Sequence, residues 1–116
     1  MSRDLSFWKV KGVTRVENKE IYVALSNEVY LPFIEDIPHL KILEDFKNSF
    51  VDWDSENEGH YYQKGKESFE LMATSQFIRT DCYEMTEHSM NKIIDILYSY
   101  NCPLYDSSID IRFDTF

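Results

Sequence analysis

The segment SFELMATSQFIRTDCYE, residues 68–84, predicts a β-hairpin. Its two strand-like halves, SFELMAT and QFIRTDCYE, meet at Thr74 and Ser75. Alternate positions of the first half are apolar: Phe69, Leu71 and Ala73. Because side chains along a strand alternate between its two faces, these three residues share one face. The two strands are therefore expected to pair as neighbours.

The hairpin leads into the clearest helical pattern in the chain. Thr86 is expected to cap the helix, because its side-chain oxygen can accept a hydrogen bond from a backbone N–H of the first turn. Apolar residues recur at helical spacing in one stripe: Met90, Ile93, Ile94, Leu97 and Tyr98. We expect the helix to end near Asn101, ahead of Pro103.

A strand and a short helix are predicted near the N-terminus. Residues 4–10 form the strand, in which Leu5 and Phe7 share one face. Asn18 is expected to cap the helix, and Asn27 is expected to end it in a left-handed conformation. The apolar stripe of this helix holds Ile21, Ala24 and Leu25.

A second helix is predicted from Pro38 to about residue 52. Proline suits the first helical turn because no hydrogen-bond donor is needed there. One apolar stripe recurs at helical spacing: Leu40, Leu43, Phe46 and Phe50. The acidic segment that follows, DWDSENEGHYYQKGK, is expected to be the longest loop.

The last strand is predicted at residues 109–114, where apolar and charged residues alternate. Its expected buried face holds Ile109, Ile111 and Phe113, and its expected solvent face holds Asp110, Arg112 and Asp114. The resulting order matches a ferredoxin-like βαββαβ sandwich, with an extra short helix in the first crossover. Residues 1–116 are thus expected to form a single α+β domain with a four-stranded antiparallel sheet.

The charge of the chain indicates the kind of partner to expect. There are 21 acidic and 12 basic residues in 116, a net charge of −9, and 16% of residues are aromatic. Residues 1–19 carry a net charge of +3, which leaves −12 for residues 20–116. An acidic surface repels nucleic acid and anionic lipid and attracts basic proteins. We therefore expect a protein partner, with no nucleic acid and no membrane.

The cellular compartment is expected to be the cytoplasm. No apolar run is long enough to span a membrane, and the N-terminus MSRDLSFWKV lacks the apolar core of a secretory signal. Cys82 and Cys102 are expected to be reduced thiols in that compartment.

No pattern in the sequence supports catalysis or a cofactor. The acidic segment places carboxylates at positions 1, 3, 5 and 7 of a calcium-loop frame, but Asn57 stands at position 6 and Gln63 at position 12. A calcium loop needs glycine and a bidentate carboxylate at these positions. The histidines lack metal-ligand spacing, and neither a phosphate-binding glycine loop nor a GxSxG or HExxH motif occurs. We expect a protein without enzymatic activity, metal or cofactor.

The acidic segment combines charge with aromatic rings and is the predicted partner-binding surface. The predicted surface comprises Asp52, Trp53, Asp54, Glu56, Glu58, Tyr61 and Tyr62. Exposed tyrosine and tryptophan side chains are frequent at interface hot spots, but burial of these rings in the core is the alternative. The next candidate pairs along the chain are Arg79 with Asp81, and Tyr105 with Asp106.

Four segments, MSRDLSFWK, TDCYEM, CPLYD and IRFD, resemble short bacterial proteins of polymorphic and contact-dependent growth inhibition toxin systems. The resemblance implies an immunity protein, encoded beside a toxin domain that it neutralises inside the producing cell. The acidic charge favours a basic, nuclease-type toxin as the partner. The alternative is a small ligand-sensing regulatory domain, since such domains also use a ferredoxin-like sheet.

Overall fold

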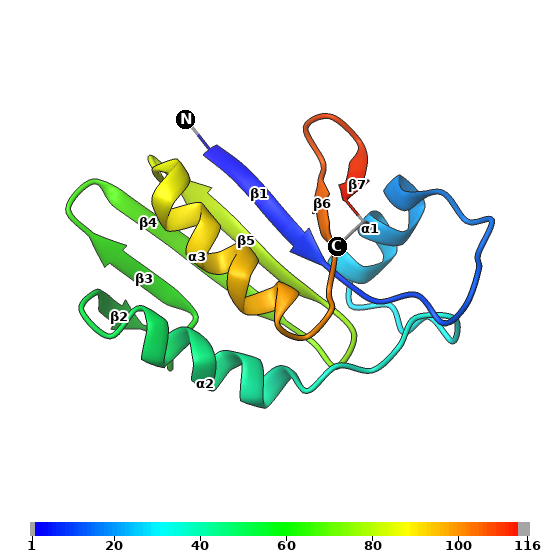
Figure 1. Ribbon diagram of the computed structural model, residues 1–116, viewed down its shortest axis with the longest axis horizontal. Coiled ribbons are helices and arrows are strands. Elements are labelled where there is room, and N and C mark those ends of the chain that lie inside the picture. Colours follow the sequence, from blue (N-terminus) through cyan, green and yellow to red (C-terminus); the bar gives the residue numbers. More distant parts are fainter. Residues whose placement is uncertain (1, 114–116) are drawn as a thin grey trace.

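The computed structural model describes residues 2–113, and within them the chain forms one seven-stranded antiparallel sheet and three helices (Figure 1). The sheet has the order β2-β3-β4-β5-β1-β6-β7. Its strands are β1 (Ser2–Phe7), β2 (Asp54–Glu56), β3 (Tyr61–Lys64), β4 (Glu67–Ala73), β5 (Ile78–Tyr83), β6 (Leu104–Asp106) and β7 (Ile111–Phe113). The helices are α1 (Asn18–Ser26), α2 (His39–Ser49) and α3 (Glu87–Tyr98).

The predicted hairpin and the helix after it are confirmed. Strand β4 pairs with β5 in an antiparallel register that sets Phe69 opposite Cys82. The side-chain oxygen of Thr86 accepts a hydrogen bond from the Ser89 backbone N–H at 3.1 Å, as expected for the cap of α3. Leu97 is fully buried, so the apolar stripe of α3 faces the sheet.

The prediction of a four-stranded ferredoxin-like sandwich is wrong, although the mixed α+β class holds. The acidic segment forms strands β2 and β3, which extend one edge of the sheet. At the other edge, residues 104–106 form β6 beside β1, and the predicted last strand is β7 beyond it. Strands of three or four residues are too short to produce a clear alternation, which explains why the pattern missed them.

One apolar cluster packs against each face of the sheet. In Figure 1, α2 and α3 lie across one face, and their buried residues join Leu5 and Phe7 of β1 in one core cluster. A second cluster joins Trp8 and Tyr105 to buried residues of α1. Because successive residues of a strand point to opposite faces, α1 covers the other face, beside β1 and β6. The remainder of that second face, over β2 to β5, is named the open face here.

Some local expectations for the helices are wrong. Leu40 of the expected α2 stripe is 72% exposed, whereas Ile42 is buried, and α2 ends at Ser49. The N-cap of α1 is Glu17. The left-handed residue after α1 is Glu28, with φ of 60°.

The expected burial of the last strand is also wrong. Ile111 and Phe113 of the edge strand β7 are exposed, and so is Ile109 in the turn before it. Arg112 points the other way, and its guanidinium donates a hydrogen bond to the Trp8 carbonyl oxygen at 2.7 Å. Asp114 lies outside the described residues.

Candidate functional site

The structure divides the predicted partner-binding surface into separate groups. Trp53 and Tyr62 belong to the core, with exposed fractions of 8% and 1%. The Trp53 ring lies edge-on to Phe50 at a centroid distance of 5.1 Å, and the Tyr62 ring stacks on Phe69 at 5.0 Å. These two rings therefore hold β2 and β3 against α2, and they offer little surface to a partner.

The charged residues of the predicted surface are exposed but face different directions. Asp52 precedes β2 and accepts a hydrogen bond from the Lys64 ammonium at 2.5 Å, which lowers the pKa of Asp52. Glu58 lies in the turn between β2 and β3, with φ of 56°. Asp54 and Glu56 lie on β2 itself.

Strand pairing extends Glu56 into a line of residues that crosses five strands. Each member stands directly opposite the next in the register of neighbouring strands: Glu56, Tyr61, Glu70, Asp81 and Asp4. We call this line the acidic row. Neighbouring strands lie about 4.8 Å apart, so the row is about 19 Å long.

The acidic row lies on the second face of the sheet, and its members on β2 to β5 belong to the open face. Its members alternate along their strands with core residues such as Tyr62, Phe69 and Leu5, which point toward α2 and α3. Residues on the same face flank the row, and they include Asp54, Gln63, Tyr83, Met72 and Arg79. The face thus combines carboxylates with the partly exposed rings of Tyr61 and Tyr83.

One end of the row is neutralised within the chain. The Arg79 guanidinium lies 3.0 Å from the Asp81 carboxylate and 4.0 Å from that of Asp4. It also stacks 5.2 Å from the centre of the Tyr22 ring, and the Tyr22 hydroxyl donates to Asp4 at 2.6 Å. Helix α1 therefore holds Arg79 over the Asp81–Asp4 end.

The other end of the row keeps its charge. Among the described residues, neither Glu56 nor Glu70 forms an ion pair or a side-chain hydrogen bond. On the neighbouring strand β5, burial and the nearby carboxylates of Glu70 and Asp81 raise the pKa of Tyr83. Within the described residues, the carboxylates of the row without an ion pair therefore lie on β2 and β4.

Such a row does not stabilise the fold. Like charges directly opposite each other on neighbouring strands are destabilising, and Glu70 with Asp81 is such a pair, whereas Arg79 bridges Asp81 and Asp4. Features that oppose folding are typical of functional positions. The acidic row is therefore the candidate functional site.

Within residues 2–113, the structure has neither a cluster of metal ligands nor an exposed thiol. Within residues 2–113, no three His, Cys, Asp or Glu side chains are placed to hold a metal ion. Cys82 and Cys102 are unbridged and buried, and burial raises the pKa of each thiol to about 11. None of the helices in the described range is both long and apolar enough to cross a membrane.

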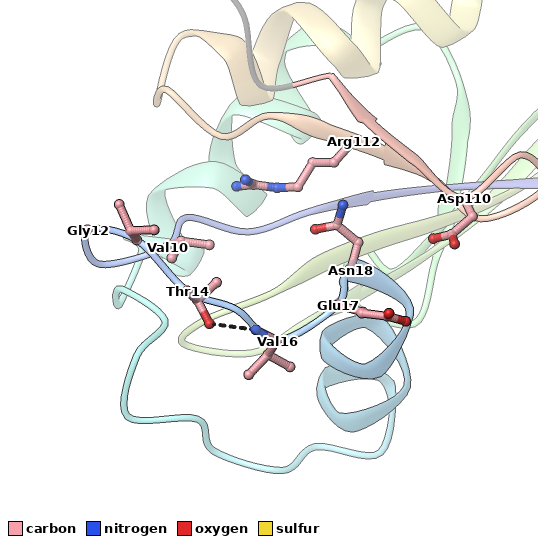
Figure 2. Close-up of a pocket in the computed structure, with 9 residues that line it drawn as sticks. Val10, Gly12, Thr14, Val16, Glu17, Asn18, Asp110 and Arg112 are labelled. Atoms are coloured by element: carbon pink, nitrogen blue, oxygen red, sulfur yellow. Dashed lines mark hydrogen bonds between the residues drawn. The ribbon is translucent and has the colours of Figure 1, made fainter.

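A solvent-open hollow of 600 Å³ lies apart from the row, between the residue 10–18 loop and β7 (Figure 2). Its walls include the charged groups of Glu17, Asp110 and Arg112. Asp110 accepts a hydrogen bond from the buried Tyr105, and Arg112 stacks 5.3 Å from the Trp8 ring. Asp110 and Arg112 therefore support the second core cluster.

The other pairs named from the sequence have contrasting positions. Arg79 and Asp81 belong to the open face, whereas Tyr105 and Asp106 are buried. Asp106 accepts hydrogen bonds from Arg3 and from the Ser108 hydroxyl.

Sequence reasoning missed Glu70 and Asp4 as site residues. Alternation along β4 and β1 could have assigned each to a solvent-facing side, but nothing local shows that they share one row.

A scan against protein-family models finds no match to this chain, and a search of curated proteins finds no similar sequence.

Proposed function

We propose that this chain binds a basic protein through the open face and neutralises it, as an immunity protein does with its cognate nuclease-type toxin domain. The observation that supports the proposal is the acidic row, because Glu70 and Asp81 stand directly opposite each other, and like charges in that arrangement oppose folding. A binding partner that supplies cations removes this repulsion. The free energy released is then available only in the complex.

The electrostatics suit the inhibition of a nuclease. A nuclease cleft carries cations that hold the phosphates of its substrate, so a row of carboxylates can occupy the same cations. Complementary charge also raises association rates from about 10⁵–10⁶ to as much as 10⁸–10⁹ M⁻¹s⁻¹ at low salt. Fast capture protects a cell that makes its own toxin.

The alternative of a ligand-sensing regulatory domain loses its basis. That reading depended on a ferredoxin-like sheet, and the seven-stranded sheet replaces it. The solvent-open hollow is lined by charged groups that also hold core residues. Protein binding is therefore the better-supported function.

The test is the association of this chain with the toxin domain encoded by the neighbouring gene, measured by stopped flow at several salt concentrations. The double variant Glu56→Lys/Glu70→Lys should reduce the association rate about tenfold or more at low salt and flatten its salt dependence. The matched control is Glu44→Lys/Asp95→Lys, which makes the same charge change on α2 and α3. The association rate of this control should fall much less than that of the open-face variant, although the two variants have the same net charge.

Co-expression provides the functional readout. The unmodified chain should protect cells from the toxin, and the open-face variant should protect them less than the control. Absence of a complex, or equal rates for the two double variants, contradicts the proposal.

A further inference from the structure

We infer that Glu56, Tyr61 and Glu70 form a subsite for a guanidinium group, so that the partner presents arginine rather than lysine to this end of the open face. The inference rests on the proposed function and names the chemistry of the partner. The occupant is an arginine side chain of the basic protein.

The register places an aromatic ring between two carboxylates. Tyr61 on β3 stands directly opposite Glu56 on β2 and directly opposite Glu70 on β4. The two carboxylates are exposed and the ring is half-buried, so all three groups can be reached from solvent. Side chains directly opposite on neighbouring strands have Cβ atoms about 4.5–5.5 Å apart, which sets both carboxylates beside the ring.

This arrangement suits a guanidinium better than an ammonium. A guanidinium is planar and weakly hydrated, so it can stack on a tyrosine ring while its N–H groups point outward to carboxylates on both sides. A lysine ammonium is compact and strongly hydrated, and it acts as a point charge. The carboxylates attract both cations, whereas the ring adds a preference for arginine.

At the other end of the row an arginine of the chain already lies between carboxylates and a tyrosine ring, although that ring comes from helix α1. There the Arg79 guanidinium lies over the Tyr22 ring at 5.2 Å and 3.0 Å from the Asp81 carboxylate. At the Glu56–Glu70 end, the described residues supply the ring and the carboxylates without a paired cation. The Arg79 contact is thus an example within this chain of a guanidinium that binds a tyrosine ring and a carboxylate together.

The experiment uses two probes of equal charge, hexa-arginine and hexa-lysine peptides, titrated into the full chain and followed by nuclear magnetic resonance. Hexa-arginine should bind more tightly than hexa-lysine, by up to about two- to fivefold, because lysine gains less than arginine from an exposed ring. The largest shifts should occur at residues 56, 61 and 70. Tyr61→Leu should remove the preference, and Tyr61→Phe should retain it because the ring remains.

Two further variants separate the ring from the charge. Glu70→Gln should weaken the binding of both peptides, and the matched control Glu44→Gln on α2 should weaken it less. Equal affinity for the two peptides, or a preference for arginine that persists in Tyr61→Leu, overturns the inference. If that occurs while the toxin complex still depends on Glu70, the guanidinium subsite is refuted and the proposed function stands.

Discussion

Replacing Glu70 with glutamine should make the free protein more stable. Glu70 stands directly opposite Asp81, which in turn stands opposite Asp4, and Arg79 neutralises only the Asp81–Asp4 end of this set. Glutamine keeps the length of the side chain and removes its charge. The variant therefore relieves repulsion on the open face without changing the core.

The expected gain follows from the geometry. Two unit charges about 5 Å apart repel by roughly 0.8 kcal/mol in water, and directly opposite pairs in sheets are worth about 0.2–1 kcal/mol. Since Glu70 is exposed, we expect a gain of about 0.3–1 kcal/mol in the free energy of unfolding. For a domain of this size the Tm should rise by about 1–5 °C.

The assay is thermal and urea unfolding at low salt and again in 1 M NaCl, with Glu44→Gln as the control. The control removes the same charge from α2, so it accounts for the change in net charge alone. Because the Debye length falls to about 3 Å in 1 M salt, exposed charges are screened and the gain from Glu70→Gln should shrink there. A Glu70→Gln variant no more stable than the control, or a gain that persists unchanged in 1 M NaCl, refutes the reasoning.

Two more predictions concern the fold. Leu97→Ala should lower the free energy of unfolding in urea by about 2–5 kcal/mol, because Leu97 of α3 is fully buried. A loss below about half a kilocalorie would contradict that packing. Burial raises the pKa of Asp106, but hydrogen bonds from Ser108 and Arg3 outweigh it and hold that pKa below its usual value. The charged form is favoured by folding, so this stabilisation is present above about pH 5 and is lost as the pH falls through the lowered pKa. Asp106→Asn should flatten the loss of unfolding free energy between about pH 5 and pH 2, whereas an unchanged slope would contradict this role.

The elements that could be predicted are those with long, regular patterns. The hairpin of β4 and β5 and the helix α3 each extend over six residues or more with a clear period, and Thr86 caps α3 as its side chain suggests. Strands β2, β3 and β6 contain three or four residues, which is too few for a period to show. The mixed α+β class was therefore predictable, but the predicted ferredoxin-like architecture was wrong in the number and order of strands.

The candidate site could be predicted only in part, for a related reason. Asp54, Glu56 and Tyr61 come from the acidic segment that the sequence indicated, and the structure places them on the open face. Trp53 and Tyr62 come from the same segment but point into the core, because strand alternation sends neighbours to opposite sides. Composition shows that charge and rings are close in the chain, but it does not show which of them share a face.

The amino-acid sequence was sufficient to establish the acidic charge, the mixed α+β class, the central hairpin and the helix that packs against it. All of these depend on composition or on contacts between residues near in the chain. The acidic row required the folded chain, because Asp4, Glu56 and Asp81 become neighbours only through the register of strands that are far apart in sequence. Strand register depends on the packing of the whole sheet, and a shift of one residue would move each carboxylate to the opposite face.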